Sequence, residues 1–222
     1  PWGSKSDKYM RLLKTLAAVD ESIGTVLETL EQTGELENTV VIFSSDNGYF
    51  MGEHTYWDKR IAYENSIRIP MIMRFPEKIK AGIQINEMCL NIDLAPTILE
   101  LANIEKPAYM QGESMVKLFG NEEASEWRES ILFEYYVDDA YPYAGPDILA
   151  VKTDNYKLID VFLENDIDEL YDLQNDPGEM NNLINNPEFD EIEKELRDEM
   201  EILKKKYKYN PDRDWWLREV KK

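Results

Sequence analysis

The sequence contains one cysteine, one histidine and few basic residues. Lys and Arg number 25 against 45 Asp and Glu, which gives a formal net charge of −20 over 222 residues. The single Cys89 excludes an internal disulfide, and we interpret it as a buried, inert thiol. No apolar run is long enough to cross a membrane. A chain this acidic is predicted to repel nucleic acid and anionic membranes, so neither is expected as a partner.

The remaining composition is typical of a globular protein. Hydrophobic residues make up 43% and aromatic residues 11% of the chain, which is enough for a core, and the length allows one large or two small domains. The first residue is Pro1 rather than Met, so we expect an excised or processed piece of a longer product. An anionic substrate would need a local Lys, Arg or metal ion to hold it.

The segment that follows the polar entry at residues 4–7 and ends just before Gly34 is predicted to form an amphipathic helix. Apolar residues from Tyr9 to Leu30 recur at helical spacing, and Gly34 follows the predicted end. Residues 39–43 form a β-branched, apolar run that is too short for a helix and typical of a strand buried on both faces. Together they indicate an αβ unit of a mainly parallel sheet, which is expected to need neighbouring strands in order to fold.

Asp46, Asn47 and Gly48 follow this strand. Ligands of α/β proteins bind beyond the carboxyl ends of the strands. Adjacent Asp and Asn side chains offer the hard oxygen ligands that Ca²⁺ and Mg²⁺ prefer. The same three residues are also common in ordinary turns, because Asn and Gly tolerate positive φ. These residues alone leave both interpretations open.

A long irregular segment, residues 49–65, comes next and carries His54 and Lys59; such loops often carry function. Further predicted elements are strands at 66–73 and 83–92, a helix at 93–102 with Asp93 as its N-cap, and a short helix at 112–119. From residue 125 the pattern changes to short strands at 131–136, 148–153, 156–161 and 169–173 and a final helix at 189–207. We therefore predict two domains, residues 1–124 and 125–222.

Several short motifs occur along the chain in a definite order. They are Ala18-Val19-Asp20, residues 39–48, Gly52-Glu53-His54, Lys59, Tyr63-Glu64, Arg68-Ile69-Pro70, residues 91–97, residues 112–114, Asn155-Tyr156-Lys157-Leu158, residues 169–173 and Asp176-Pro177. In this order they resemble the C-terminal half of the sulfatase family, within the alkaline-phosphatase-like superfamily. The resemblance implies an α/β fold: part of a mainly parallel sheet sandwiched by helices, followed by a small antiparallel sheet packed on a helix.

The resemblance also implies roles for individual residues. Asp46 and Asn47 align with two ligands of a metal ion, Ca²⁺ in preference to Mg²⁺. Lys59 aligns with a catalytic lysine that contacts a sulfate oxygen, and the neighbouring Arg60 is the alternative for that role. His54 is expected near the site, where its role stays open between proton donor, substrate contact and anchor of the loop.

Two further expectations concern polar residues around the site. Tyr136 belongs to an aromatic and acidic cluster, residues 135–139, that is expected to contact a sugar, with an ordinary core-and-surface role as the alternative. Glu64 and Arg68 lie four residues apart and are expected to pair structurally.

The family's nucleophile is a formylglycine made from Cys or Ser in a Cys/Ser-x-Pro-x-Arg motif, and the chain has no such motif. The nucleophile is therefore expected on a preceding segment. The leading hypothesis is the C-terminal part of a calcium-dependent sulfatase that is periplasmic or secreted. Its expected partners are a sulfated small molecule or carbohydrate and the missing N-terminal half of the catalytic domain. The alternatives are a phosphodiesterase or phosphonate hydrolase of the same superfamily, and a non-catalytic, calcium-binding remnant.

Overall fold

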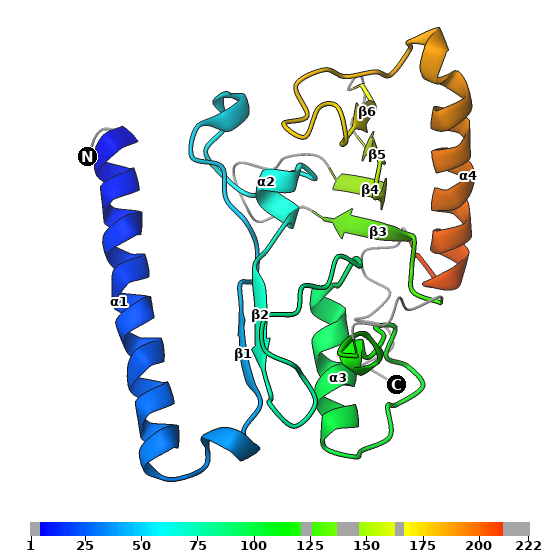
Figure 1. Ribbon diagram of the computed structural model, residues 1–222. Helices are drawn as coiled ribbons and strands as arrows, with labels where there is room; N and C mark the ends of the chain where they lie inside the picture. Colours follow the sequence, from blue (N-terminus) through cyan, green and yellow to red (C-terminus); the bar gives the residue numbers. More distant parts are fainter. Residues whose placement is uncertain (1–4, 121–125, 137–146, 163–166, 211–222) are drawn as a thin grey trace, which may run out of the picture. The chain divides into compact units, whose positions relative to one another are not determined.

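The computed structural model describes residues 5–120, 126–136, 147–162 and 167–210 (Figure 1). Contacts within the chain define two compact units. The first unit comprises Pro1–Ser45, Pro70–Gln84 and Phe119–Glu122, and the second comprises Asp46–Ile69, Ile85–Leu118 and Glu123–Lys222. The predicted division into residues 1–124 and 125–222 stays a prediction. No helix within the described ranges is long and apolar enough to cross a membrane.

The first unit begins with α1, Lys5–Gln32, which confirms the predicted helix. It ends in a Schellman motif, in which the amides of Gly34 and Glu35 donate to carbonyls of the last turn at 3.0 and 2.9 Å. Gly34 adopts a φ of +75°, which glycine reaches without steric cost. The apolar stripe is not covered by the described part of this chain, since Leu16 keeps 50% and Val26 keeps 56% of its surface exposed.

β1, Val41–Ser44, confirms the strand predicted at residues 39–43. Its partner is β2, Met71–Arg74, and the two strands pair antiparallel rather than parallel. Within the described ranges they form a two-stranded sheet, so the expectation of two buried faces is not met here. Phe43 and Ile72 lie opposite each other in the register and keep 36% and 65% of their surface exposed, so the described residues do not cover this face of the sheet.

The strand predicted at residues 66–73 is wrong in its first half. Its first two residues belong to α2, Glu64–Ile67, a single helical turn in which the amides of Ser66 and Ile67 both donate to Tyr63 O. β2 begins only after Pro70, whose nitrogen has no proton for a ladder hydrogen bond. Residues 46–69 therefore connect β1 to β2 in sequence but belong to the second unit.

The second unit contains a four-stranded antiparallel sheet in the order β3-β4-β5-β6. Its strands are β3 Ser130–Tyr135, β4 Asp147–Thr153, β5 Tyr156–Phe162 and β6 Glu169–Asp172. All four short strands of the prediction are confirmed. Successive side chains of β4 point to opposite faces, so Leu149 and Val151 enter one core cluster and Ile148 and Ala150 enter another.

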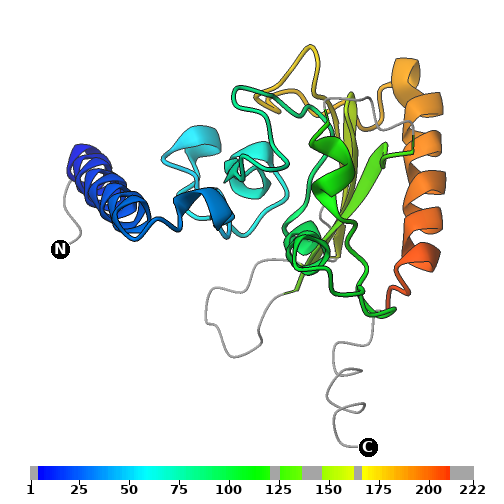
Figure 2. The same ribbon diagram turned by 60° about the horizontal axis from the view of Figure 1, so that its bottom comes forward.

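α4, Asp190–Lys206, confirms the predicted final helix and covers one face of this sheet (Figure 1 and Figure 2). Leu196, Met200 and Leu203 of α4 are buried in the same cluster as the apolar residues of that face. On the opposite face, Ala62 is buried among sheet residues together with its half-buried neighbours. The second face of the sheet therefore supports the loop that carries the predicted site.

Residues 83–92 do not form the predicted strand. Met88 O accepts hydrogen bonds from the side chains of Trp127 and Arg128, each at 2.9 Å. In a strand this carbonyl would accept a hydrogen bond from the backbone of a neighbouring strand, whereas here it accepts from two side chains. Cys89 lies in this irregular segment, where burial is the largest of the effects that raise its pKa to about 11, as expected for an inert thiol.

The helix predicted at residues 93–102 is confirmed as α3, Leu94–Leu101. Asp93 does not cap it through its side chain. Instead, the fully buried Asp93 carboxylate accepts two hydrogen bonds from the Arg128 guanidinium, at 2.5 and 2.7 Å. The short helix predicted at residues 112–119 is a 3-10 turn, Met115–Leu118.

The packing of α4 on the sheet gives a first prediction. Leu203→Ala is expected to lower the free energy of unfolding by roughly 2–5 kcal/mol, because truncation leaves a cavity between helix and sheet. Ile202→Ala is the matched control on the same helix, since Ile202 keeps 56% of its surface exposed and Leu203 only 3%. Urea unfolding of the complete gene product measures both variants. Equal losses would contradict the assignment of Leu203 to the core.

Candidate functional site

The turn formed by Asp46, Asn47 and Gly48 lies in the second unit. Asp46 is exposed and Asn47 is half-buried. The Asp46 carboxylate accepts from the Asn47 amide at 2.9 Å, and Asn47 Nδ2 donates to Gly48 O at 2.8 Å. The second bond uses the nitrogen of the Asn47 side chain, which cannot bind a hard cation, and so orients the amide group.

Gly48 is required by a close approach of two backbone segments. Its amide donates to Ser66 O of α2 at 2.7 Å. A Cβ at this position would lie 2.1 Å from Asn65 O, far inside a normal contact. Neither Asn47 nor Gly48 has a positive φ, so the usual reason for these residues in a turn does not apply. The turn packs so closely against the backbone of α2 that no side chain fits at position 48, and therefore only glycine is compatible with this contact.

The loop around Lys59 is ordered by its backbone while the Lys59 side chain is exposed. The amide of the fully buried Phe50 donates to Asp58 O at 2.9 Å. The Lys59 amide donates to the Asp58 carboxylate at 2.8 Å, and Arg60 forms an ion pair with the same carboxylate at 2.5 Å. Among the described residues, no carboxylate lies within ion-pair distance of the Lys59 ammonium. The loop therefore presents a fixed backbone and an exposed cation.

Ser66 holds both parts of the candidate site. Its side chain is buried, with 3% of the residue exposed. Its carbonyl accepts from the Gly48 amide, and its Oγ donates to Lys59 O. The turn with Asp46 and Asn47 and the loop with Lys59 thus meet on one helical turn, which sequence reasoning did not anticipate.

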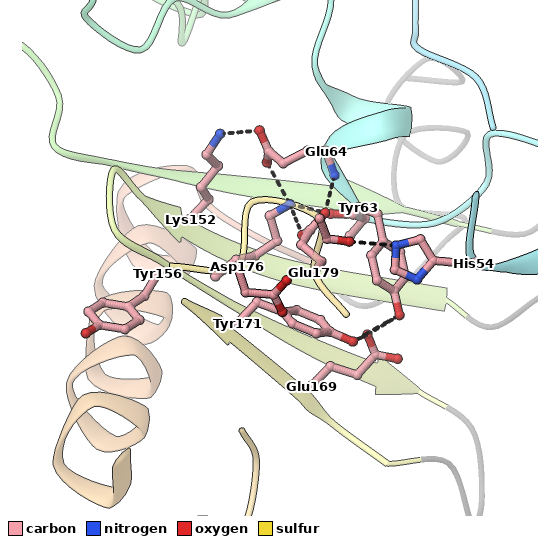
Figure 3. A network of polar contacts seen from close by, with 12 residues as sticks. His54, Tyr63, Glu64, Lys152, Tyr156, Glu169, Tyr171, Asp176 and Glu179 are labelled. Atoms are coloured by element: carbon pink, nitrogen blue, oxygen red, sulfur yellow. Dashed lines mark hydrogen bonds and ion pairs between the residues drawn. The ribbon is translucent and has the colours of Figure 1, made fainter. Parts of the chain in front are cut away.

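His54 is held between the loop and the C-terminal part of the second unit. Its Nε2 lies 2.9 Å from Gly178 O, and because a carbonyl only accepts, the Nε2 atom carries the proton. Its ring lies 4.6 Å from the ring of Tyr63 (Figure 3). It also lies 5.9 Å from the ring of Phe50. The Tyr63 hydroxyl in turn donates to the Glu169 carboxylate of β6 at 2.7 Å. These contacts make His54 an anchor of the loop, and a catalytic role for it stays a prediction.

Tyr136 follows β3 and keeps 39% of its surface exposed. Its hydroxyl donates to the Glu134 carboxylate at 2.9 Å. Partial burial and this carboxylate raise the pKa of Tyr136, so the phenol remains a neutral hydrogen-bond donor. Asp138 and Asp139, the acidic members of the predicted cluster, lie outside the described residues. A substrate contact by Tyr136 stays a prediction.

The most deeply buried charges were missed from the sequence. Lys157 on β5 is fully buried. Its ammonium donates to Glu179 Oε1 at 2.6 Å and to Ala62 O at 2.9 Å, and it lies 2.7 Å from Glu64 Oε1. A lysine in a strand is usually read as a surface residue. The only signal in the sequence was the presence of Lys157 and Glu64 in motifs of the sulfatase resemblance.

The predicted pairing of Glu64 with Arg68 is wrong. Glu64 pairs with Lys157 and, at 2.8 Å, with Lys152 of β4 (Figure 3). Burial acts to raise the pKa of Glu64, but the two ammonium groups outweigh it, so the pKa lies below its ordinary value. Residues four apart on a helix attract each other only weakly at a surface. Two lysines supplied by the sheet in a buried position are stronger partners.

The described residues contain no cluster of three or more His, Cys, Asp or Glu side chains that could hold a metal ion. Asp46 and Asn47 offer hard oxygen ligands of the kind that Ca²⁺ takes, and Ca²⁺ is bound by about six to eight such ligands. The two residues fit the chemistry of the ion and do not complete its coordination.

The family model described as N-sulphoglucosamine sulphohydrolase, C-terminal, matches residues 52–206. The chain therefore belongs to the sulfatase family, and the resemblance read from the motifs is confirmed. N-acetylglucosamine-6-O-sulfatase from Bacteroides thetaiotaomicron is 41% identical over 216 residues, which cover 94% of this chain and 38% of that relative. Some further relatives are named extracellular sulfatases.

Solved structures share the fold. A structure in complex with its substrate D-glucosamine-2-N,6-O-disulfate superposes with a TM-score of 0.84 at 39% identity, covering 89% of this chain and 40% of that chain. A phosphonate monoester hydrolase from Silicibacter pomeroyi superposes with a TM-score of 0.77 at 25% identity, covering 85% and 39%. The predicted α/β fold of the alkaline-phosphatase-like type is confirmed. The chain spans about two fifths of the length of these proteins.

The close packing of the Gly48 turn against α2 gives a second prediction. Gly48→Ala is expected to displace the turn, because the new Cβ would overlap Asn65 O. A loss of roughly 1–3 kcal/mol in unfolding free energy is expected, the usual cost of overpacking. Gly178→Ala is the matched control, since a Cβ there meets its nearest atom at an ordinary 3.6 Å. Thermal unfolding of the complete gene product compares the two. A Gly48→Ala variant as stable as Gly178→Ala would contradict the close approach.

Proposed function

We propose that this chain is the C-terminal part of a sulfatase that hydrolyses sulfate esters. The observation that carries the proposal is that Ser66 of α2 bonds the backbone of two segments, at the Gly48 amide and at Lys59 O. The first segment carries two hard oxygen ligands, Asp46 and Asn47, and the second carries the exposed Lys59 side chain. A sulfate ester is an anion, and a cation site and an ammonium on one support are suited to bind it. Membership of the sulfatase family supports this reading.

Asp46 and Asn47 would supply two ligands of a divalent cation, Ca²⁺ in preference to Mg²⁺. The donor atoms fit such an ion, and its remaining ligands would come from outside the described residues. A bound cation offsets the negative charge of the sulfate group. The bond from Asn47 Nδ2 to Gly48 O supports the assignment, because it orients the amide by its nitrogen.

Lys59 would donate a hydrogen bond to a sulfate oxygen and stabilise the charge that develops there in the transition state. Arg60 is less suited, because its guanidinium is already paired with Asp58 at 2.5 Å. The bonds to the amide and carbonyl of Lys59 fix the base of its side chain. His54 holds the same loop from the other side.

The nucleophile of the proposal, a formylglycine, has no matching motif among these 222 residues and would belong to another segment. We infer a sulfated glycan as the substrate class. The inference is supported by a relative named N-acetylglucosamine-6-O-sulfatase and by the neighbour solved with D-glucosamine-2-N,6-O-disulfate. A periplasmic or secreted location is part of the proposal, supported by relatives named extracellular sulfatases.

A second candidate function is phosphonate monoester hydrolysis, which the similarity to the Silicibacter pomeroyi enzyme favours. Both reactions place an anionic, tetrahedral group between a metal ion and a cation. Steady-state rates of the complete gene product on 6-O-sulfated glucosamine and on an aryl phosphonate monoester separate them. A larger kcat/KM for the phosphonate would move the proposal to that reaction. Calcium binding without either activity would leave a binding remnant.

The metal assignment gives a third prediction. Asp46→Ala in the complete gene product is expected to reduce kcat/KM for sulfate release at least about a hundredfold, since a metal ion supplies several kcal/mol to such reactions. Calcium affinity, measured by calorimetry, should fall with it. Asp198→Ala on the exposed side of α4 is the matched control and should keep both values. Full activity and unchanged calcium affinity in Asp46→Ala would contradict the assignment of Asp46 as a metal ligand.

The choice between the two neighbouring cations gives a fourth prediction. Lys59→Met is expected to reduce kcat roughly 10²–10³-fold, the usual effect of removing one donor to a developing anion. Arg60→Met should cost less, because the Arg60 guanidinium already pairs with Asp58. Both variants are assayed for sulfate release. A larger loss in Arg60→Met would transfer the sulfate contact to Arg60.

A further inference from the structure

We propose that the buried charges of Lys157, Glu64 and Glu179 position the candidate site through α2. The inference rests on the proposed sulfatase function, since it concerns the alignment of Asp46 and Lys59. The three charged residues act on the backbone that carries the site, not on a substrate. They are therefore positioning residues, and they link the C-terminal sheet to the site.

The first step is the burial of the Lys157 ammonium. Lys157 is fully buried, and an ammonium has three hydrogen-bond donors. Three oxygens lie around it: Glu179 Oε1 at 2.6 Å, Glu64 Oε1 at 2.7 Å and Ala62 O at 2.9 Å. An unpaired charge inside a protein is very unfavourable. The three oxygens must therefore stay together, although Glu179 lies 115 residues after Glu64 in the sequence.

The second step leads from these charges to α2. Glu64 is the first residue of α2, and its amide also donates to Glu179 Oε2 at 2.7 Å. Glu64 is thus held by both its backbone and its side chain. Two residues later, Ser66 binds the Gly48 amide and Lys59 O. A helix of one turn has little stability of its own, so its position depends on such contacts.

The third step is a second attachment at the same place. Gly178 O accepts from His54 Nε2, and Gly178 directly precedes Glu179. Two adjacent residues therefore hold both ends of the segment from His54 to Glu64 (Figure 3). Glu179 adopts a φ of +54°, a strained conformation for a buried, non-glycine residue. Such strain persists only where the surroundings enforce it, and it is concentrated at sites with a functional role.

The test is Glu64→Gln in the complete gene product. The variant removes the charge that faces Lys157 and Lys152 but keeps the Lys157–Glu179 pair and the bond to Ala62 O. We expect kcat for sulfate release to fall roughly 10–100-fold, the usual effect of losing a residue that orients a site, with a smaller change in KM. Amide hydrogen exchange in residues 46–66 should become faster, while α4 and the sheet keep their protection. Lys157→Met should give the same pattern with a larger loss.

Glu201→Gln is the matched control, because Glu201 forms a surface pair with Lys204 on α4 at 2.7 Å, away from α2. This variant should keep the wild-type kcat for sulfate release and the wild-type rate of amide hydrogen exchange at residues 46–66. Unchanged kcat and unchanged exchange at residues 46–66 in Glu64→Gln would overturn the proposal, as would faster exchange spread equally over the sheet and α4. If the wild-type product hydrolyses no sulfate ester, the proposed function fails, and exchange at residues 46–66 alone decides whether the charges position that segment.

Discussion

The second unit depends on the burial of one ammonium group, that of Lys157. Removing an ion from water costs several kcal/mol even after the protein relaxes, and the cost is recovered only when all its donors are paired. The Lys157 ammonium donates to Glu179 and to Ala62 O, and the Glu64 carboxylate lies 2.7 Å away as an ion-pair partner. Hydrophobic residues of similar size are often as stable or more stable at such positions. The arrangement is therefore better understood as a device that fixes the relative position of three segments than as a source of stability.

The sheet of the second unit has two faces with different tasks. One face packs on α4 through aliphatic side chains and forms a conventional core. The other face receives Ala62 and the charges around Lys157, and so it carries a long loop that has little regular secondary structure. The loop stays ordered because its polar groups find partners: Phe50 with Asp58, and Tyr63 with Glu169. The candidate site thus takes its geometry from the sheet.

Much of this fold could be predicted from local patterns, and the errors have physical causes. The strands β3 to β6 are short runs rich in apolar residues, and α1 and α4 repeat apolar residues at helical spacing, so these elements could be predicted. Residues 83–92 have a strand-like composition, but Trp127 and Arg128 occupy the Met88 carbonyl. The contacts of Glu64 were missed because its partners Lys152 and Lys157 are about ninety residues away. Sequence motifs indicated which residues mattered, and only the structure shows what they contact.

Electrostatics constrains how the proposed site can work. The chain carries a formal charge of −20, yet exposed charges beyond about 8 Å are largely screened at physiological salt, so an anionic sulfate group responds mainly to nearby groups. Asp46 by itself adds negative charge at the turn and would repel that group. The proposed divalent cation on Asp46 and Asn47 would reverse the sign of the field there. Lys59 alone offers one ammonium, so the proposed site attracts sulfate effectively only when the cation is bound, and loss of the cation should weaken both binding and turnover.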